Sequence, residues 1–203
     1  MINDEKKVKI ISVLKTYIFP ALCVGLVILL DQLTKCYFKN NYFVGQKTEI
    51  IPGFFDFKYV QNTGSAFSLL ADKSWGQLFF KIITPIALII MCIFYYFNRK
   101  GGAFFKYGMA FIIGGTIGNF IDRIAYSFVV DFLSFTFGTY KFAVFNIADS
   151  FLCVGIVMVF IHLLFLDKDA IFRKKKKKSD EIADENVETE RIETVEEKES
   201  ENG

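Results

Sequence analysis

The hydrophobic positions of this chain gather into four long runs, separated by segments that are richer in polar and charged residues. Each run approaches the roughly 20 apolar residues that a helix needs to cross a bilayer core of about 30 Å. Residues 50–60 differ, because apolar and polar positions alternate there around a Pro-Gly turn signal, which predicts short strands at the membrane surface. We therefore expect four transmembrane helices, at residues 16–35, 77–97, 104–124 and 146–166.

The composition places the chain among membrane proteins. Its 203 residues are 53% hydrophobic and 17% aromatic, and the mean hydropathy is +0.36. The predicted fold class is membrane all-α, with four transmembrane helices, a small extracytoplasmic β-rich region and a periplasmic-side loop or helix. We expect a cytoplasmic N-terminal segment at residues 1–15, a four-span domain at 16–167, and a charged, disordered cytoplasmic tail at 168–203.

The basic residues predict the orientation of the spans. Most of them flank the spans at the N-terminus, in the short connection around residues 98–106 and after the last run. Cytoplasmic flanks carry an excess of Lys and Arg, so both termini should be cytoplasmic and residues 36–76 and 125–145 should face outward. We also expect the lysine run at residues 174–178 to contact anionic lipid.

Four carboxylates lie in or beside the apolar runs, where they are costly and need a reason. The single histidine, His162, lies far from them, and the four cysteines have no metal-ligand spacing. Nucleophilic Ser-His or Cys-His chemistry and a zinc site are therefore unsupported. General acid and base chemistry by paired carboxylates, without metal or cofactor, remains. The acids, which the predicted orientation gathers at the outer side, are Asp31, Asp122, Asp131 and Asp149.

Two of these acids have an obvious structural explanation. Asp31 precedes Lys35 by one helical turn, which predicts an intrahelical ion pair. Asp122 adjoins Arg123 and follows Asn119 by three residues, so a satisfied polar network that includes an Asp122–Arg123 pair is the expected arrangement. Either group could still orient a neighbour.

The other two acids are harder to explain as structural residues. Asp149 follows Asn146 by three residues at the start of the last run, where a carboxylate could cap a helix. Asp131 lies between apolar neighbours with no adjacent cation. The residues therefore favour an intramembrane aspartyl hydrolase that uses Asp131 and Asp149, with Asp122 and Asp149 as the rival pairing.

Two other classes of protein stay open at this point. A small proton-coupled membrane transporter would also carry acids in its spans, although it would distribute them through the depth of the membrane. A non-enzymatic membrane adaptor would explain the charged tail, yet it would leave Asp131 without a role.

Five ordered blocks resemble the motifs of the lipoprotein signal peptidase family, also called signal peptidase II. The resemblance covers residues 17–166 and leaves out both charged ends of the chain. The blocks are residues 31–35, 62–67, 114–119 running into 122–123, 129–132 and 145–150.

The resemblance implies a bacterial intramembrane aspartyl endopeptidase that is inhibited by globomycin. Such an enzyme removes the signal peptide of prolipoproteins on the amino side of a diacylglyceryl-modified cysteine. It implies a multi-pass monomer in the cytoplasmic (inner) membrane, with prolipoprotein and membrane lipid as partners, no nucleic acid and no cofactor. The implied catalytic pair is Asp131 and Asp149, supported by Asp31, Lys35, Asn62, Gly64, Asn119, Asp122, Arg123 and Asn146.

Overall fold

The computed structural model describes residues 4–64 and 75–167. The chain divides into two compact units, Met1–Val159 and Phe160–Gly203. The predictions about the tail at residues 168–203, and about residues 65–67 of the second sequence block, lie outside the described residues.

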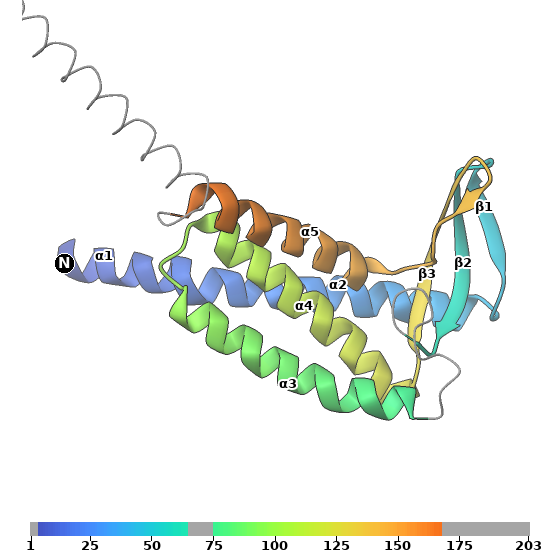
Figure 1. The fold of residues 1–203 in the computed structure, drawn as a ribbon, viewed down its shortest axis with the longest axis horizontal. Helices are drawn as coiled ribbons and strands as arrows, with labels where there is room; N and C mark the ends of the chain where they lie inside the picture. Colours follow the sequence, from blue (N-terminus) through green and yellow to red (C-terminus); the bar gives the residue numbers. More distant parts are fainter. Residues whose placement is uncertain (1–3, 65–74, 168–203) are drawn as a thin grey trace, which may run out of the picture. The chain divides into compact units, whose positions relative to one another are not determined.

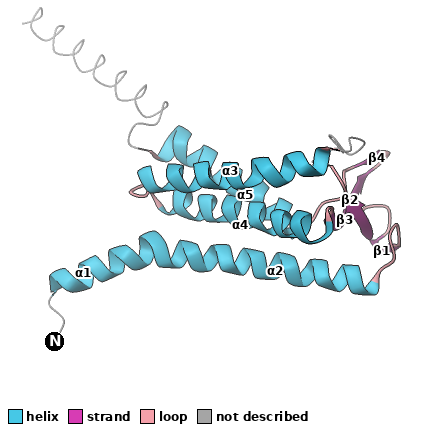
Figure 2. Ribbon diagram, turned by 90° about the horizontal axis from the view of Figure 1, so that it is seen from below, coloured by secondary structure: helices cyan, strands magenta, loops and turns pink. Residues whose placement is uncertain are grey.

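Long helices make up most of the first unit (Figure 1). A helix, α1, continues through a π-helical turn, η1, into α2, so that the three form one rod beside α3, α4 and α5 (Figure 2). Their bounds are α1 Asp4–Val13, η1 Leu14–Ile18, α2 Phe19–Asn41, α3 Gly76–Phe97, α4 Ala103–Tyr126 and α5 Ile147–Ile161. The second unit holds a further π-helical turn, η3 His162–Leu166. The Nε2 atom of His162 lies 3.5 Å from Oδ2 of Asp167, the residue that follows this turn.

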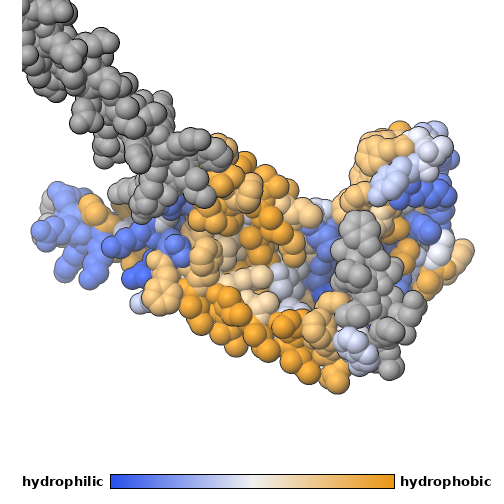
Figure 3. Space-filling model, in the orientation of Figure 1, coloured by the Kyte–Doolittle hydropathy of each residue, from blue (hydrophilic) through white to orange (hydrophobic). Residues whose placement is uncertain are grey.

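The four predicted spans are confirmed, because four helices among the described residues are long and apolar enough to cross a membrane. Figure 3 shows their hydrophobic surface as a broad band over the helices. The first helix is longer than predicted and runs over Asp4–Asn41. Its added residues include neither glycine nor proline, and Pro20 closely follows the π-helical turn η1, where the helical hydrogen-bond pattern already changes.

A four-stranded antiparallel sheet lies at the end of the bundle opposite α1 (Figure 1). The predicted strands form a hairpin, β1 Lys47–Ile51 and β2 Phe55–Asn62, around the Pro-Gly turn. Residues 125–145, for which no strand was predicted, add two strands, β3 Val129–Phe137 and β4 Tyr140–Lys141, in the order β1-β2-β3-β4. Of these, β3 pairs with β2 and the short β4 pairs with β3.

An apolar core joins the sheet to the end of α2. The ring of Phe38 stacks on Phe132 with centroids 4.1 Å apart, and Tyr59 and Val130 complete the buried cluster. Because side chains alternate across a strand, packing of Val130 and Phe132 on this side turns Asp131 to the other face of β3. A bulge in β2 between Phe57 and Val60 lies directly opposite this part of β3.

Helix α4 is the most buried of the spans, and its glycines allow close contacts with its neighbours. A Cβ added to Gly114 would lie 2.9 Å from Val27 of α2, and one added to Gly115 would clash with the Ala148 carbonyl of α5. One added to Gly118 would lie 2.5 Å from a carboxylate oxygen of Asp31. These glycines therefore serve packing within the chain.

We expect Gly118→Ala to lower the unfolding midpoint of the detergent-solubilised protein by several degrees, because the added methyl group must displace the buried carboxylate of Asp31. The matched control is Gly25→Ala on α2, where the new Cβ would meet nothing within 4 Å. Equal effects of the two substitutions would contradict this account of the α2–α4 contact.

Candidate active site

The start of α5 positions one of the two acids that the sequence singled out. Asn146 precedes the helix, and its side-chain oxygen accepts the backbone N–H of Asp149 at 2.9 Å. In the opposite direction, Oδ2 of Asp149 accepts the backbone N–H of Asn146 at 3.2 Å. This reciprocal pattern is a capping box, so the cap expected of Asp149 is present. It occupies only one carboxylate oxygen of Asp149.

Asn146 also reaches the second acid. Its Nδ2 donates to Oδ1 of Asp131 at 2.7 Å and to Oδ1 of Asn119 at 3.0 Å. Asn119 in turn donates from Nδ2 to the free oxygen of Asp149 at 2.7 Å. Two asparagines thus connect Asp131 on β3 with Asp149 on α5 through an unbroken set of short hydrogen bonds.

Asn62 completes the surroundings of Asp131 from the end of β2. Its Nδ2 donates to Oδ2 of Asp131 at 2.8 Å, and its Oδ1 accepts the backbone N–H of Gly64 at 3.0 Å. The Asn62 amide is therefore held with its donor toward the acid. Gly64 contributes its backbone N–H to this turn.

A buried ion cluster lies behind the asparagines. Lys35 approaches Asp31 at 2.9 Å and Asp122 at 3.3 Å, and its third donor reaches Oδ1 of Asn119 at 2.8 Å. Lys35 is only 2% exposed, and both carboxylates are buried as well. The predicted Asp31–Lys35 pair is confirmed.

The remaining carboxylate oxygens of this cluster are also paired. Asp31 accepts the backbone N–H of Ala148 at 2.9 Å, and Asp122 accepts that of Val130 at 2.9 Å. The Gln32 amide lies between the two acids and donates to Asp31 and to Asp122, each at 3.2 Å. Gln32 was not predicted as a site residue, although it stands inside the first sequence block. Asp31 and Asp122 thereby fix the helix α5 and the strand β3 to the bundle.

The expected pairing of Asp122 with Arg123 is wrong. Asp122 turns inward to Lys35, whereas Arg123, its neighbour on the helix, turns to a different face. The Arg123 guanidinium lies 4.9 Å above the Phe80 ring, and its Nη1 is 3.4 Å from the Asn119 carbonyl. Its Nε is buried without a hydrogen-bond partner in the described part of the chain.

A cavity of about 970 Å³ opens beside the two acids. Asp131 and Asp149 both line it, together with Asn62, Asn119 and Arg123, whereas the lining does not include the acids of the Lys35 cluster. In Figure 3 the hollow between the helices and the sheet is hydrophilic at its base. The four aspartates therefore divide into two buried behind the site and two that face the cavity.

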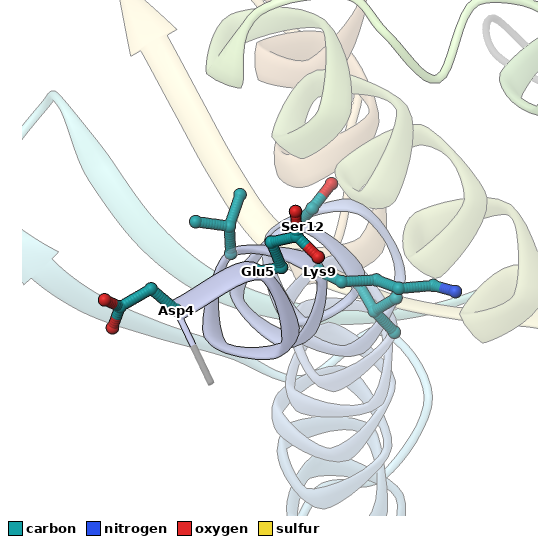
Figure 4. A pocket seen from close by; sticks show the side chains of 6 residues that line it. Asp4, Glu5, Lys9 and Ser12 are labelled. Atoms are coloured by element: carbon teal, nitrogen blue, oxygen red, sulfur yellow. The ribbon is translucent and has the colours of Figure 1, made fainter. Parts of the chain in front are cut away.

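A second hollow lies along α1, far from these acids in the chain. Figure 4 shows its labelled side chains, Asp4, Glu5, Lys9 and Ser12, around a single helical segment. All of its lining residues belong to α1, so no second element converges on it. It has no feature of a reaction site.

Electrostatics distinguish Asp131 from an ordinary carboxylate. Burial and the neighbouring charge of Asp149 raise its pKa to about 7, although hydrogen bonds from Asn62 and Asn146 oppose the shift. The ion pairs of the described residues include Asp31 and Asp122 but neither Asp131 nor Asp149. Within residues 4–64 and 75–167, no three His, Cys, Asp or Glu side chains are grouped as metal ligands.

Four apolar helices with a polar cavity where they meet a small sheet define a multi-span membrane protein with a buried acidic site. The chain belongs to the signal peptidase II family, whose model matches residues 23–165. This confirms the resemblance found in the sequence and makes the protein a peptidase by family.

Curated relatives support the same assignment. A lipoprotein signal peptidase of Listeria welshimeri serovar 6b is 42% identical over 142 residues, which cover 70% of this chain and 90% of the relative. A lipoprotein signal peptidase of Lactobacillus johnsonii is 42% identical over 144 residues, again 70% and 90% of the two chains.

Solved structures share the fold. A bacterial membrane enzyme determined by the in meso method at 2.3 Å resolution superposes with a TM-score of 0.67 at 33% identity, over 73% of this chain and 88% of that chain. Another, at 1.9 Å resolution, has a TM-score of 0.66 at 33% identity, over 76% and 96% of the two chains. The fold is therefore that of a membrane enzyme.

We expect the carboxyl group of Asp131 to titrate near pH 7, and Asp149→Asn to lower its pKa because the neighbouring negative charge is removed. Carboxyl ¹³C NMR of labelled protein in detergent micelles would measure both values. Asp56→Asn, which removes a buried carboxylate paired with Lys47 on the sheet, should leave the Asp131 titration unchanged. An Asp131 midpoint near 4 would contradict the electrostatic description.

We expect Lys35→Gln to destabilise the protein by about 3 to 5 kcal/mol, because it leaves two buried carboxylates without their cation. Denaturant unfolding in detergent would measure the loss. The control is Lys7→Gln, which breaks an exposed pair with Asp4 and should change stability little. Similar losses in both variants would show that Lys35 does not hold the cluster together.

Proposed function

We propose that the protein is an intramembrane aspartyl endopeptidase that cleaves bacterial prolipoproteins on the amino side of the diacylglyceryl-modified cysteine. Asp131 and Asp149 form the catalytic dyad. The observation that carries this proposal is that both acids line one cavity and are connected through one side chain, that of Asn146. The names of the lipoprotein signal peptidases of Listeria and Lactobacillus support the substrate class.

The two acids lie in different surroundings. Asp131 has the raised pKa, which suits the acid that holds the shared proton near neutral pH. Asp149 lies in the first turn of α5, where the helix dipole favours a negative charge. We therefore assign the general base to Asp149 and the general acid to Asp131.

In this mechanism, Asp149 removes a proton from a water molecule while the water oxygen forms a bond to the scissile carbonyl carbon. Asp131 transfers its proton to the carbonyl oxygen, which gives a neutral tetrahedral intermediate. The carbon–nitrogen bond then breaks as the nitrogen receives the proton held by Asp149, and the hydroxyl proton returns to Asp131. Neither a metal nor a covalent enzyme intermediate is needed.

The remaining polar groups of the cavity would bind and orient the reactants. Asn62 and Asn119 donate to the outer oxygens of the acids and so fix the planes of both carboxylates. The unpaired Nε of Arg123 is a buried donor beside the dyad, available to a substrate carbonyl. Asp31, Lys35 and Asp122 act only through these residues and support the site from behind.

The orientation predicted from the basic residues belongs to this proposal. The acids and the sheet lie at the end of the bundle opposite α1, and α1 carries Lys6, Lys7 and Lys9. With α1 cytoplasmic, the site lies near the outer face of the bacterial cytoplasmic membrane, where a translocated prolipoprotein presents its cysteine. We propose that the enzyme works there as a monomer in contact with membrane lipid.

The transporter alternative is not favoured, because the chain belongs to a peptidase family. The rival pairing of Asp122 with Asp149 also loses support, since Asp122 is bound to Lys35 and to the Val130 backbone and does not line the cavity.

We expect Asp131→Asn and Asp149→Asn each to lower kcat on a diacylglyceryl-modified prolipoprotein at least ~100-fold while the protein stays folded, because each removes an acid or base from the reaction. A gel-based cleavage assay with purified enzyme in lipid would measure the rates, and globomycin should block the wild-type reaction.

The matched control is Asp56→Asn, which neutralises a buried carboxylate outside the cavity and should retain kcat. A normal rate for Asp131→Asn together with loss in Asp122→Asn would instead support the rival pairing. Full activity in all of these variants would refute the aspartyl mechanism.

A further inference from the structure

One hydroxyl group in the cavity has no partner of its own. Thr84 of α3 lines the cavity and is only 8% exposed. Within the described part of the chain, the structure gives its side chain no hydrogen bond. Its oxygen is not among the fully enclosed atoms that lack a partner, so it borders the open space of the cavity, where a ligand can reach it.

Two other threonines of the spans donate a hydrogen bond from the hydroxyl to a backbone carbonyl of their own helix. Thr34 on α2 donates to the Leu30 carbonyl at 2.9 Å, and Thr116 on α4 donates to the Ile112 carbonyl at 2.7 Å. Both use the carbonyl four residues earlier, which is the ordinary way for a helix to satisfy a threonine. Thr84 has no such bond, so its O–H is available to a group in the cavity.

The position of Thr84 indicates which kind of group could reach it. It lies eight residues into α3, about 12 Å along the helix from the end next to the sheet. The acids and asparagines lie at that end, so Thr84 lines a deeper part of the cavity, together with Leu152 and Cys153 of α5. A ligand that fills both parts has its reacting bond near the acids and an apolar portion beside Thr84.

We propose that Thr84 is a specificity-determining residue whose hydroxyl donates a hydrogen bond to a carbonyl oxygen of the bound substrate. This inference rests on the proposed peptidase function and deepens it. The carbonyl belongs either to the signal-peptide backbone or to an ester of the diacylglyceryl group, because both carry the same acceptor into apolar surroundings. The bond forms on substrate binding and takes no part in proton transfer, so it affects affinity and leaves the chemical step unchanged.

The test compares Thr84→Val, which keeps the shape and removes the donor, with Thr84→Ser, which keeps the hydroxyl. On a diacylglyceryl-modified prolipoprotein we expect Thr84→Val to raise KM about tenfold with kcat within about twofold of wild type. Thr84→Ser should restore a KM close to that of wild type. A purely structural role would not separate KM from kcat in this way.

A second substrate distinguishes the two sources of the carbonyl. An analogue with ether-linked chains keeps the peptide carbonyls and lacks those of the esters. A rise in KM on both substrates assigns the bond to the peptide, whereas a rise only on the ester substrate assigns it to the lipid. Thr34→Val is the control, because its hydroxyl is bonded within α2 and lies outside the cavity lining.

The inference is overturned by an unchanged KM for Thr84→Val on the ester substrate, or by equal impairment of Thr84→Val and Thr84→Ser. Thr84→Ala, which also lacks the hydroxyl, replaces Thr84→Val if the latter has a lowered unfolding midpoint. Failure of the wild-type protein to cleave the prolipoprotein would refute the proposed function instead, so the two failures are distinguishable.

Discussion

The rest of the site depends on the ion pairs and the hydrogen bond that the buried ammonium group of Lys35 makes. This group lies among Asp31, Asp122 and Asn119, so one side chain of α2 binds its own helix and α4 at the same time. Two carboxylates at this depth would otherwise repel each other and lose their hydration. With the cation between them, Asp31 and Asp122 also accept the backbone N–H groups of Ala148 and Val130, which fixes the start of α5 and of β3.

Close packing and charge pairing require each other here. Gly118 has no side chain where the Asp31 carboxylate lies, so α4 can approach α2 closely enough for Lys35 to reach Asn119. A larger residue would separate the helices, and the lysine would lose one of its three acceptors. The position of Asn119, and through it that of Asp149, therefore depends on the close contact between Gly118 and the Asp31 carboxylate.

The sequence predicted the spans, the first hairpin and the family, because these depend on apolar run length, on turn residues and on local motifs. It also predicted the Asp31–Lys35 pair, whose partners are one helical turn apart. It failed for the partner of Asp122, because adjacent residues on a helix point in different directions and the actual partner, Lys35, is distant in the chain. It also missed β3, whose pairing with β2 joins residues separated by a whole pair of transmembrane helices.

The ion cluster behind the site is fully paired within the chain, whereas two groups that line the cavity have no partner of their own. Asp31, Asp122 and Lys35 have their partners within the chain, so none of them has a hydrogen-bonding group to spare for a substrate. The Nε of Arg123 and the hydroxyl of Thr84 lack partners in the described residues, and both residues line the cavity with Asp131 and Asp149. A ligand with carbonyl oxygens satisfies these two donors, and an extended peptide carries such an acceptor at every residue along its path past the two acids.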